Sequence, residues 1–91
     1  MLVPDQRVRV RADMPPGHVR TPAYLRGKPG IVERNLGPFP NPEERAYGHD
    51  GPTVQLHRVR FRMADLWPDT PHPNDTVEAE IFAHWLLAED A

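Results

Sequence analysis

The chain of 91 residues contains no cysteine, which excludes disulfides, thiolate metal sites and a cysteine nucleophile. It has no apolar run near the roughly 18 residues that a membrane-spanning helix needs, and no signal-peptide pattern opens it. Aromatic residues make up only 8% of the chain. We therefore expect no membrane partner, and the composition is compatible with the cytoplasm, which is the location that we predict.

The residues that are abundant are those that make turns. Twelve prolines and six glycines indicate many turns and few long helices. Alternating polar and apolar residues predict strands over 6–11, 30–34, 54–61 and 76–81. We expect long loops over 12–29 and 35–53, a helical turn over 63–67, and one turn over 83–87 that leads into a short last strand. In the third strand the apolar phase shifts, and a bulge near His57 or Arg58 would explain the shift.

These elements predict one all-β domain over residues 1–91. About five short antiparallel strands with long connections favour a small barrel. An SH3-like barrel fits best, since it places a short helical turn before the last strand.

Charge is unevenly distributed along the chain. Residues 1–34 carry seven Lys/Arg and three acids, whereas residues 63–91 carry seven acids and no Lys/Arg. Such asymmetry is typical of an interaction surface. The alternative, that the two halves neutralise each other within the fold, stays open.

No motif in the chain indicates a self-sufficient enzyme. The five histidines include no i, i+4 pair, so we expect no metal site in this chain. A nucleophile elbow, a phosphate-binding glycine loop and a helical carboxylate pair are also missing from the sequence. Any catalytic role would therefore need a partner.

Two arginine-rich strands raise the possibility of nucleic-acid binding. Arg7, Arg9 and Arg11 share one strand face, and Arg58, Arg60 and Arg62 share another. The segment from Gly27 to Val32 also loosely resembles ribosome-associated SH3-like (KOW-type) modules. However, the chain is acidic overall, with a net charge of −2, and no aromatic residues alternate with the arginines for base stacking. We expect no nucleic-acid partner and keep an RNA-binding module as an alternative.

The stretch PPGHVRTPAYLRGKPG, residues 15–30, is the remaining candidate for chemistry. His18 and Arg20 follow a Pro-Pro-Gly turn, and Pro22 stiffens the chain after them. A guanidinium on a stiff loop suits recognition of a carboxylate, phosphate or oxidised sulfur. From the residues alone, we favour the alternative that Arg20 caps carbonyls or pairs with an acid of its own domain.

The order of the sequence blocks resembles a known family. VRVR (8–11), PPGHVRTPAYLRGKPGIV (15–32), GPFPNPEERAYGHDGP (37–52), VRF (59–61), ADLW (64–67) and NDTVEAEIFAHWL (74–86) are similar to the C-terminal half of the nitrile hydratase beta subunit. They are equally similar to the corresponding separate subunit of thiocyanate hydrolase. The resemblance covers nearly the whole chain, and its PGH-x-R-x-PAY-x-RG-K segment is highly specific.

The resemblance implies an SH3-like domain that packs on an alpha subunit with a cysteine-rich loop. That loop holds non-corrin Co(III) or non-haem Fe(III), and two of its cysteines are oxidised. The family's arginine in PGH-x-R, which hydrogen-bonds the oxidised cysteines, corresponds to Arg20. The implied activity is that of a lyase that hydrates a nitrile to an amide. His18 and Tyr24 are weaker candidates for shaping the loop and Arg26 for the subunit interface; for these three we favour a structural role.

One departure from the family pattern is the missing helical half, which supplies a second arginine and much of the substrate pocket. We expect a further subunit in its place, in a hetero-oligomer that resembles thiocyanate hydrolase. A small activator that accompanies metal loading and a fragment of a longer protein are the alternatives. The sequence start at Met1 favours the natural short subunit, which we do not expect to be active alone.

Overall fold

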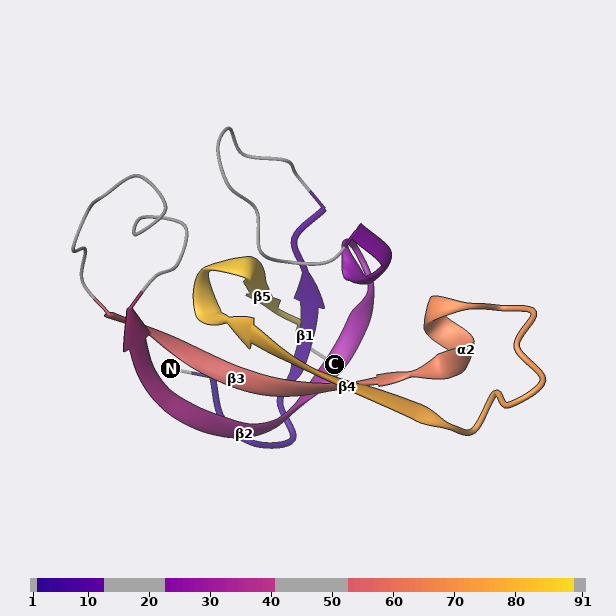
Figure 1. Ribbon diagram of the computed structural model, residues 1–91, viewed down its shortest axis with the longest axis horizontal. Coiled ribbons are helices and arrows are strands. Elements are labelled where there is room, and N and C mark those ends of the chain that lie inside the picture. The colour runs from indigo at the N-terminus through magenta and orange to yellow at the C-terminus, as the bar shows by residue number, and fades with distance from the viewer. Residues whose placement is uncertain (1, 13–22, 41–52, 90–91) are drawn as a thin grey trace.

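In the computed structural model, five antiparallel strands form one sheet in the order β4-β3-β2-β1-β5 (Figure 1). The structure describes residues 2–12, 23–40 and 53–89. The strands are β1 (Arg7–Val10), β2 (Pro29–Pro40), β3 (Thr53–Arg62), β4 (Thr76–Phe82) and β5 (Leu86–Ala88). The helical elements are η1 (Ala23–Leu25), α2 (Met63–Leu66) and η2 (Ala83–Trp85). The predicted all-β class is confirmed.

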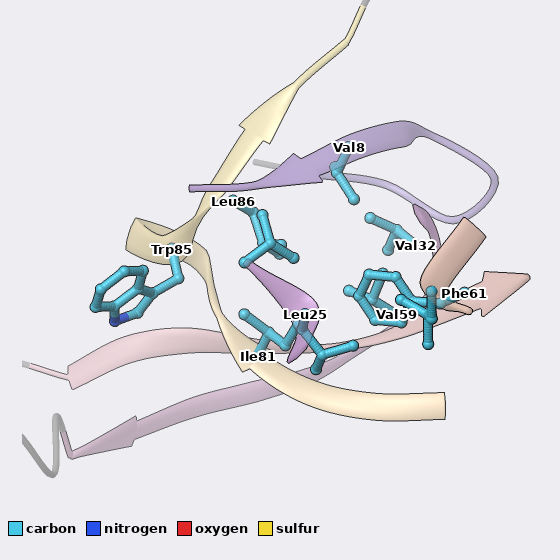
Figure 2. Packing of buried hydrophobic residues seen from close by; sticks show 10 residues of the cluster. Val8, Leu25, Val32, Val59, Phe61, Ile81, Trp85 and Leu86 are labelled. Carbon is cyan, nitrogen blue, oxygen red and sulfur yellow. The ribbon is translucent and has the colours of Figure 1, made fainter. Parts of the chain in front are cut away.

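The core lies between β1 and β5 on one side and β2, β3 and β4 on the other (Figure 2). Every strand contributes, because alternate side chains of a strand point to the same face. The short helical elements close the ends of this core with Leu25, Leu66 and Trp85. Full burial of each such side chain contributes roughly 1.5–3 kcal/mol. The strands supply the rest of the buried set: Val8, Val10, Val32, Val59, Phe61, Ile81 and Leu86.

Close packing at the start of β2 requires glycine. A Cβ on Gly30 would lie 2.7 Å from Val59 Cγ1 and 2.9 Å from Phe61 Cε1. These distances are too short for non-bonded carbon atoms, so any side chain here would displace the centre of the core. Gly30 thus leaves room for the side chains of Val59 and Phe61 on the core face of the sheet.

The predicted loop over 35–53 is wrong for its first part, because β2 continues to Pro40. β1 pairs with only Pro29–Ile31 of β2, so the far half of β2 has β3 as its one strand neighbour in the described sheet. Proline is tolerated where one edge of a strand is unpaired. Pro38 and Pro40 therefore did not end the strand, although their presence suggested a loop.

The pairing of β2 with β3 is irregular opposite His57 and Arg58, where a bulge was predicted, but the extra residues belong to β2. β3 keeps its register with β4 from Leu56 to Arg62, and the irregularities lie in β2, between Val32 and Arg34 and between Asn35 and Gly37. Val54 and Leu56 are half-buried on the opposite phase of β3 from the buried Val59 and Phe61. His57 occupies a core position in line with Val59 and Phe61 and is fully buried.

Burial of His57 makes its charge state matter for stability. Neither ring nitrogen has a hydrogen-bond partner in the described structure. The loss of hydration disfavours the imidazolium and lowers the pKa of His57 below its ordinary value of 6.5. The neutral side chain is therefore the form that suits the core.

We predict that the free energy of unfolding falls as the pH drops from about 6.5 toward the lower pKa of folded His57. In that window the unfolded chain binds a proton that the folded chain does not, at a cost of at most about 1.4 kcal/mol per pH unit. Urea unfolding between about pH 7.5 and pH 5.5 measures it. His57→Gln should flatten the dependence, whereas His72→Gln, at an exposed histidine, should keep it. An unchanged slope in His57→Gln contradicts the assignment.

Candidate functional site

The segment with His18 and Arg20 runs from residue 13 to residue 22 and lies outside the described residues. The structure does describe both of its ends. One end is Arg11 and Ala12, directly after β1, and the other is η1, directly before β2 (Figure 1). The candidate site is therefore built from the contacts that hold these two ends.

Backbone hydrogen bonds join the two ends to each other. The amide of Gly27 donates to the carbonyl of Val10 over 2.9 Å, and the amide of Val10 donates to the carbonyl of Lys28 over 3.0 Å. These bonds extend the pairing of β1 with β2 to the base of the segment. The described residues on either side of the segment 13–22 are thus neighbours.

Arg11 fastens the first end to η2. Its amide donates to the carbonyl of Trp85 over 2.9 Å, and its Nη1 donates to the carbonyl of His84 over 3.2 Å. The guanidinium also lies 5.8 Å from the centre of the Trp85 ring, within the range of a cation–π interaction. Since Trp85 is buried in the core, the first end is tied directly to the core.

The second end is fastened by η1. Leu25 is fully buried and holds this turn against the core. The chain then reverses at Gly27, whose φ of +74° is readily adopted by glycine but strained for other residues. The carbonyl of Gly27 accepts a hydrogen bond of 2.7 Å from Nη1 of Arg9.

An exposed aromatic pair flanks the second end. The ring of Tyr24 stacks on that of Trp67, with centroids 5.6 Å apart and an interplanar angle of 19°. Both residues keep almost half of their surface exposed, 46% and 45%. Trp67 follows α2, and its amide donates to the carbonyl of Met63. The stack therefore connects η1 to α2.

The sequence-predicted residues are thus placed unevenly. Tyr24 lies on η1 beside the loop, and Arg26 follows it, half-buried. Roles for His18, Arg20, Tyr24 and Arg26 stay predictions. Trp67 was not predicted from the sequence, where it figured only as the end of a helical turn before Pro68, and no local pattern pairs it with Tyr24.

The arginines at the two ends are engaged within the domain, Arg9 by Glu89 and the carbonyl of Gly27, and Arg11 by the carbonyl of His84. Within residues 2–12, 23–40 and 53–89, no three His, Asp or Glu side chains lie close enough to hold a metal ion together. In the same ranges no helix is sufficiently long and apolar to span a membrane. What the described residues do is fix the positions of the two ends of the segment.

Comparison with known proteins points to one family. The sequence model of the family "Nitrile hydratase beta subunit, C-terminal" matches residues 4–88. The nitrile hydratase subunit beta of Pseudomonas chlororaphis is 42% identical over 82 residues, which are 88% of this chain and 37% of that protein. The cobalt-containing nitrile hydratase subunit beta of Pseudonocardia thermophila is 34% identical over 83 residues, 91% of this chain and 36% of that protein.

The fold agrees with these matches. A solved chain of recombinant apo thiocyanate hydrolase from Thiobacillus thioparus superposes with a TM-score of 0.87 at 30% identity. The superposition covers 94% of this chain and 73% of that chain. The chain spans little more than a third of the length of the nitrile hydratase subunits that it matches. Sequence and structure together show that it belongs to the family formed by the C-terminal domain of the nitrile hydratase beta subunit.

Proposed function

We propose that the chain is a beta-type subunit of a nitrile hydratase, which adds water to a nitrile and releases an amide. The observation that carries this proposal is the family match over residues 4–88, which includes the whole PGH-x-R segment. The closed base of the loop supports it, since a segment that reaches into a partner must be held at both ends. We expect the chain alone to be inactive, and its cytoplasmic location stays a prediction.

In this proposal Arg20 is the residue that acts on the partner. Its guanidinium carries five N–H donors in a planar fork and stays charged. Sulfenate and sulfinate oxygens of oxidised cysteines are acceptors that carry negative charge. Arg20 would donate to these oxygens of the alpha subunit and hold their orientation, in the way that outer groups orient the ligands of a metal.

The metal in this proposal, Co(III) or Fe(III), belongs to the alpha subunit. The residues of this chain are compatible with that division, because the chain has no cysteine to supply a thiolate. The name of the Pseudonocardia thermophila relative supports cobalt. When bound, the metal would supply Lewis-acid polarisation of the nitrile or of water. This chain would supply only the hydrogen bonds and positive charge of Arg20.

The partners follow from the lengths of the related proteins. The matched nitrile hydratase subunits are about two and a half times as long as this chain, and in this proposal a further polypeptide supplies the part that the chain does not match. The thiocyanate hydrolase chain is much closer in length, with 73% of it covered. This supports thiocyanate hydrolysis as the second candidate function.

We predict that Arg20→Lys lowers kcat/KM of the assembled enzyme about tenfold to a hundredfold. Lysine keeps the charge but loses the planar fork that can grip two oxygens at once. The absorption spectrum of the metal site gives a readout that does not depend on turnover, and it should shift. Both are measured on the complex reconstituted with the alpha subunit.

Arg34→Lys is the matched control, because Arg34 is an exposed arginine of β2. It should leave the rate and the spectrum unchanged. An Arg20→Lys enzyme with normal turnover and a normal spectrum overturns the role of Arg20. Active enzyme that purifies without this chain would instead support a metal-loading activator.

We also predict that Tyr24→Ala loosens the base of the loop. Loss of the stack on Trp67 should lower the free energy of unfolding by about 0.5–1.5 kcal/mol, in addition to the loss from the smaller buried apolar surface. Turnover should fall as well, because in this proposal η1 anchors one end of the segment that carries Arg20. Urea unfolding of the chain and rates of the reconstituted complex measure the two effects.

Phe39→Ala provides the comparison, since Phe39 is similarly exposed, at 43%, and contacts no other ring in the described structure. Its unfolding free energy should change by no more than about 0.5 kcal/mol. Equal losses in the two variants would show that the stack has no special role at the loop.

A further inference from the structure

A groove on the outer face of the sheet is left unused by the proposed function. Its volume is about 340 Å³. It lies opposite to the core, because its arginines alternate along their strands with the buried valines and Phe61. The side chains that line it come from four elements: Arg7, Pro29, Ile31, Arg60, Arg62 and Asp65.

The strand register brings the arginines of the groove together. Arg7 pairs with Ile31 across β1 and β2, and Ile31 pairs with Arg60 across β2 and β3. Two strand spacings of about 4.8 Å therefore separate the backbones of Arg7 and Arg60. Ile31 lies between them, where it can contact the aliphatic parts of both side chains.

The arginines of the groove differ from their neighbours, because no described acid pairs with them. Nε of Arg9 lies 3.2 Å from Oε2 of Glu89, and Nη2 of Arg58 lies 3.5 Å from Oε2 of Glu80. In contrast, the three groove arginines form no ion pair or side-chain hydrogen bond with any described residue. They are Arg7, Arg60 and Arg62.

Two acids lie close to the groove without neutralising it. Asp65 lines it, and Glu78 is opposite Arg60 in the register of β3 and β4. Neither forms an ion pair with a groove arginine in the described part of the chain. Three cations against the single acid in the lining leave a positive charge, on a face where Arg9 and Arg58 are paired.

We propose that this groove binds an acidic segment of a partner polypeptide through two carboxylates. Each carboxylate can accept two parallel N–H bonds from one guanidinium. Side chains two residues apart on an extended segment lie about 7 Å apart, and the flexible arginine side chains can close the remaining difference. The apolar floor at Pro29 and Ile31 would contact the residue between the two acids.

The chemistry of the groove favours a protein over a nucleic acid. Among the described residues no aromatic side chain lines it, so bases would find no stacking surface there. The acids Asp65 and Glu78 would repel a continuous phosphate backbone, and the whole chain carries a net charge of −2. Separate carboxylates at two points avoid both difficulties.

The test is an NMR titration of the isotope-labelled chain with a short peptide that has Glu-Ser-Glu at its centre. Amide signals of Arg7, Ile31 and Arg60 should shift, and binding should weaken at least about threefold between about 20 mM and 150 mM salt. A peptide with Gln-Ser-Gln should cause no shift. Arg60→Gln or Arg7→Gln should weaken binding about fivefold to tenfold.

Arg34→Gln removes the same charge from an exposed position outside the groove and should change the affinity less than about twofold. The proposal is overturned if the two peptides bind equally or if Arg34→Gln acts as strongly as Arg60→Gln. It is also overturned if single-stranded RNA of equal charge shifts the same amides at lower concentration. Circular dichroism of each variant establishes that it is folded.

Discussion

The pairing between the end of β1 and the start of β2 is the constraint on which the rest of this structure depends. Two backbone hydrogen bonds, between Val10 and residues Gly27 and Lys28, bring together positions that lie far apart in the chain. They complete the sheet at its centre, where β2 joins β3 and β4 to β1 and β5. They also bring together the residues that flank the segment 13–22, so fold and candidate site share one set of bonds.

The loop is held by interactions that reach into the core. Arg11 is bonded to η2, which carries the buried Trp85, and η1 carries the buried Leu25. Arg11 and η1, which flank residues 13–22, are therefore fixed by folding before any partner binds. The exposed stack of Tyr24 on Trp67 adds a contact at the surface. This arrangement suits a chain whose proposed contribution is one correctly oriented arginine.

Sequence patterns predicted the strands in which polar and apolar residues alternate along the chain. Val8 and Val10 alternate with arginines, and Thr76 to Ile81 alternates likewise, so period two was sufficient there. Local pattern was insufficient at Pro38, because whether proline is tolerated depends on which edge of β2 is paired. It was insufficient at His57 as well, since polarity suggested a break in phase where the structure buries the ring.

Features of the site that depend on tertiary contacts could not be predicted. The Tyr24–Trp67 stack joins residues that lie more than forty positions apart. The groove of Arg7, Arg60 and Arg62 depends on strand register, and its charge depends on which arginines form ion pairs with glutamates. The motif from Pro15 to Gly30 could be recognised from the sequence, because its residue types themselves carry the family resemblance.

The central claim is that this chain works as one subunit against a metal-bearing partner. Native mass spectrometry of the chain purified from its own cells tests that claim most directly. We expect a hetero-oligomer that contains this chain, a polypeptide with a C-x-x-C-S-C loop carrying oxidised cysteines, and a cobalt or iron ion. A chain that is always isolated alone, or bound only to nucleic acid, would contradict it.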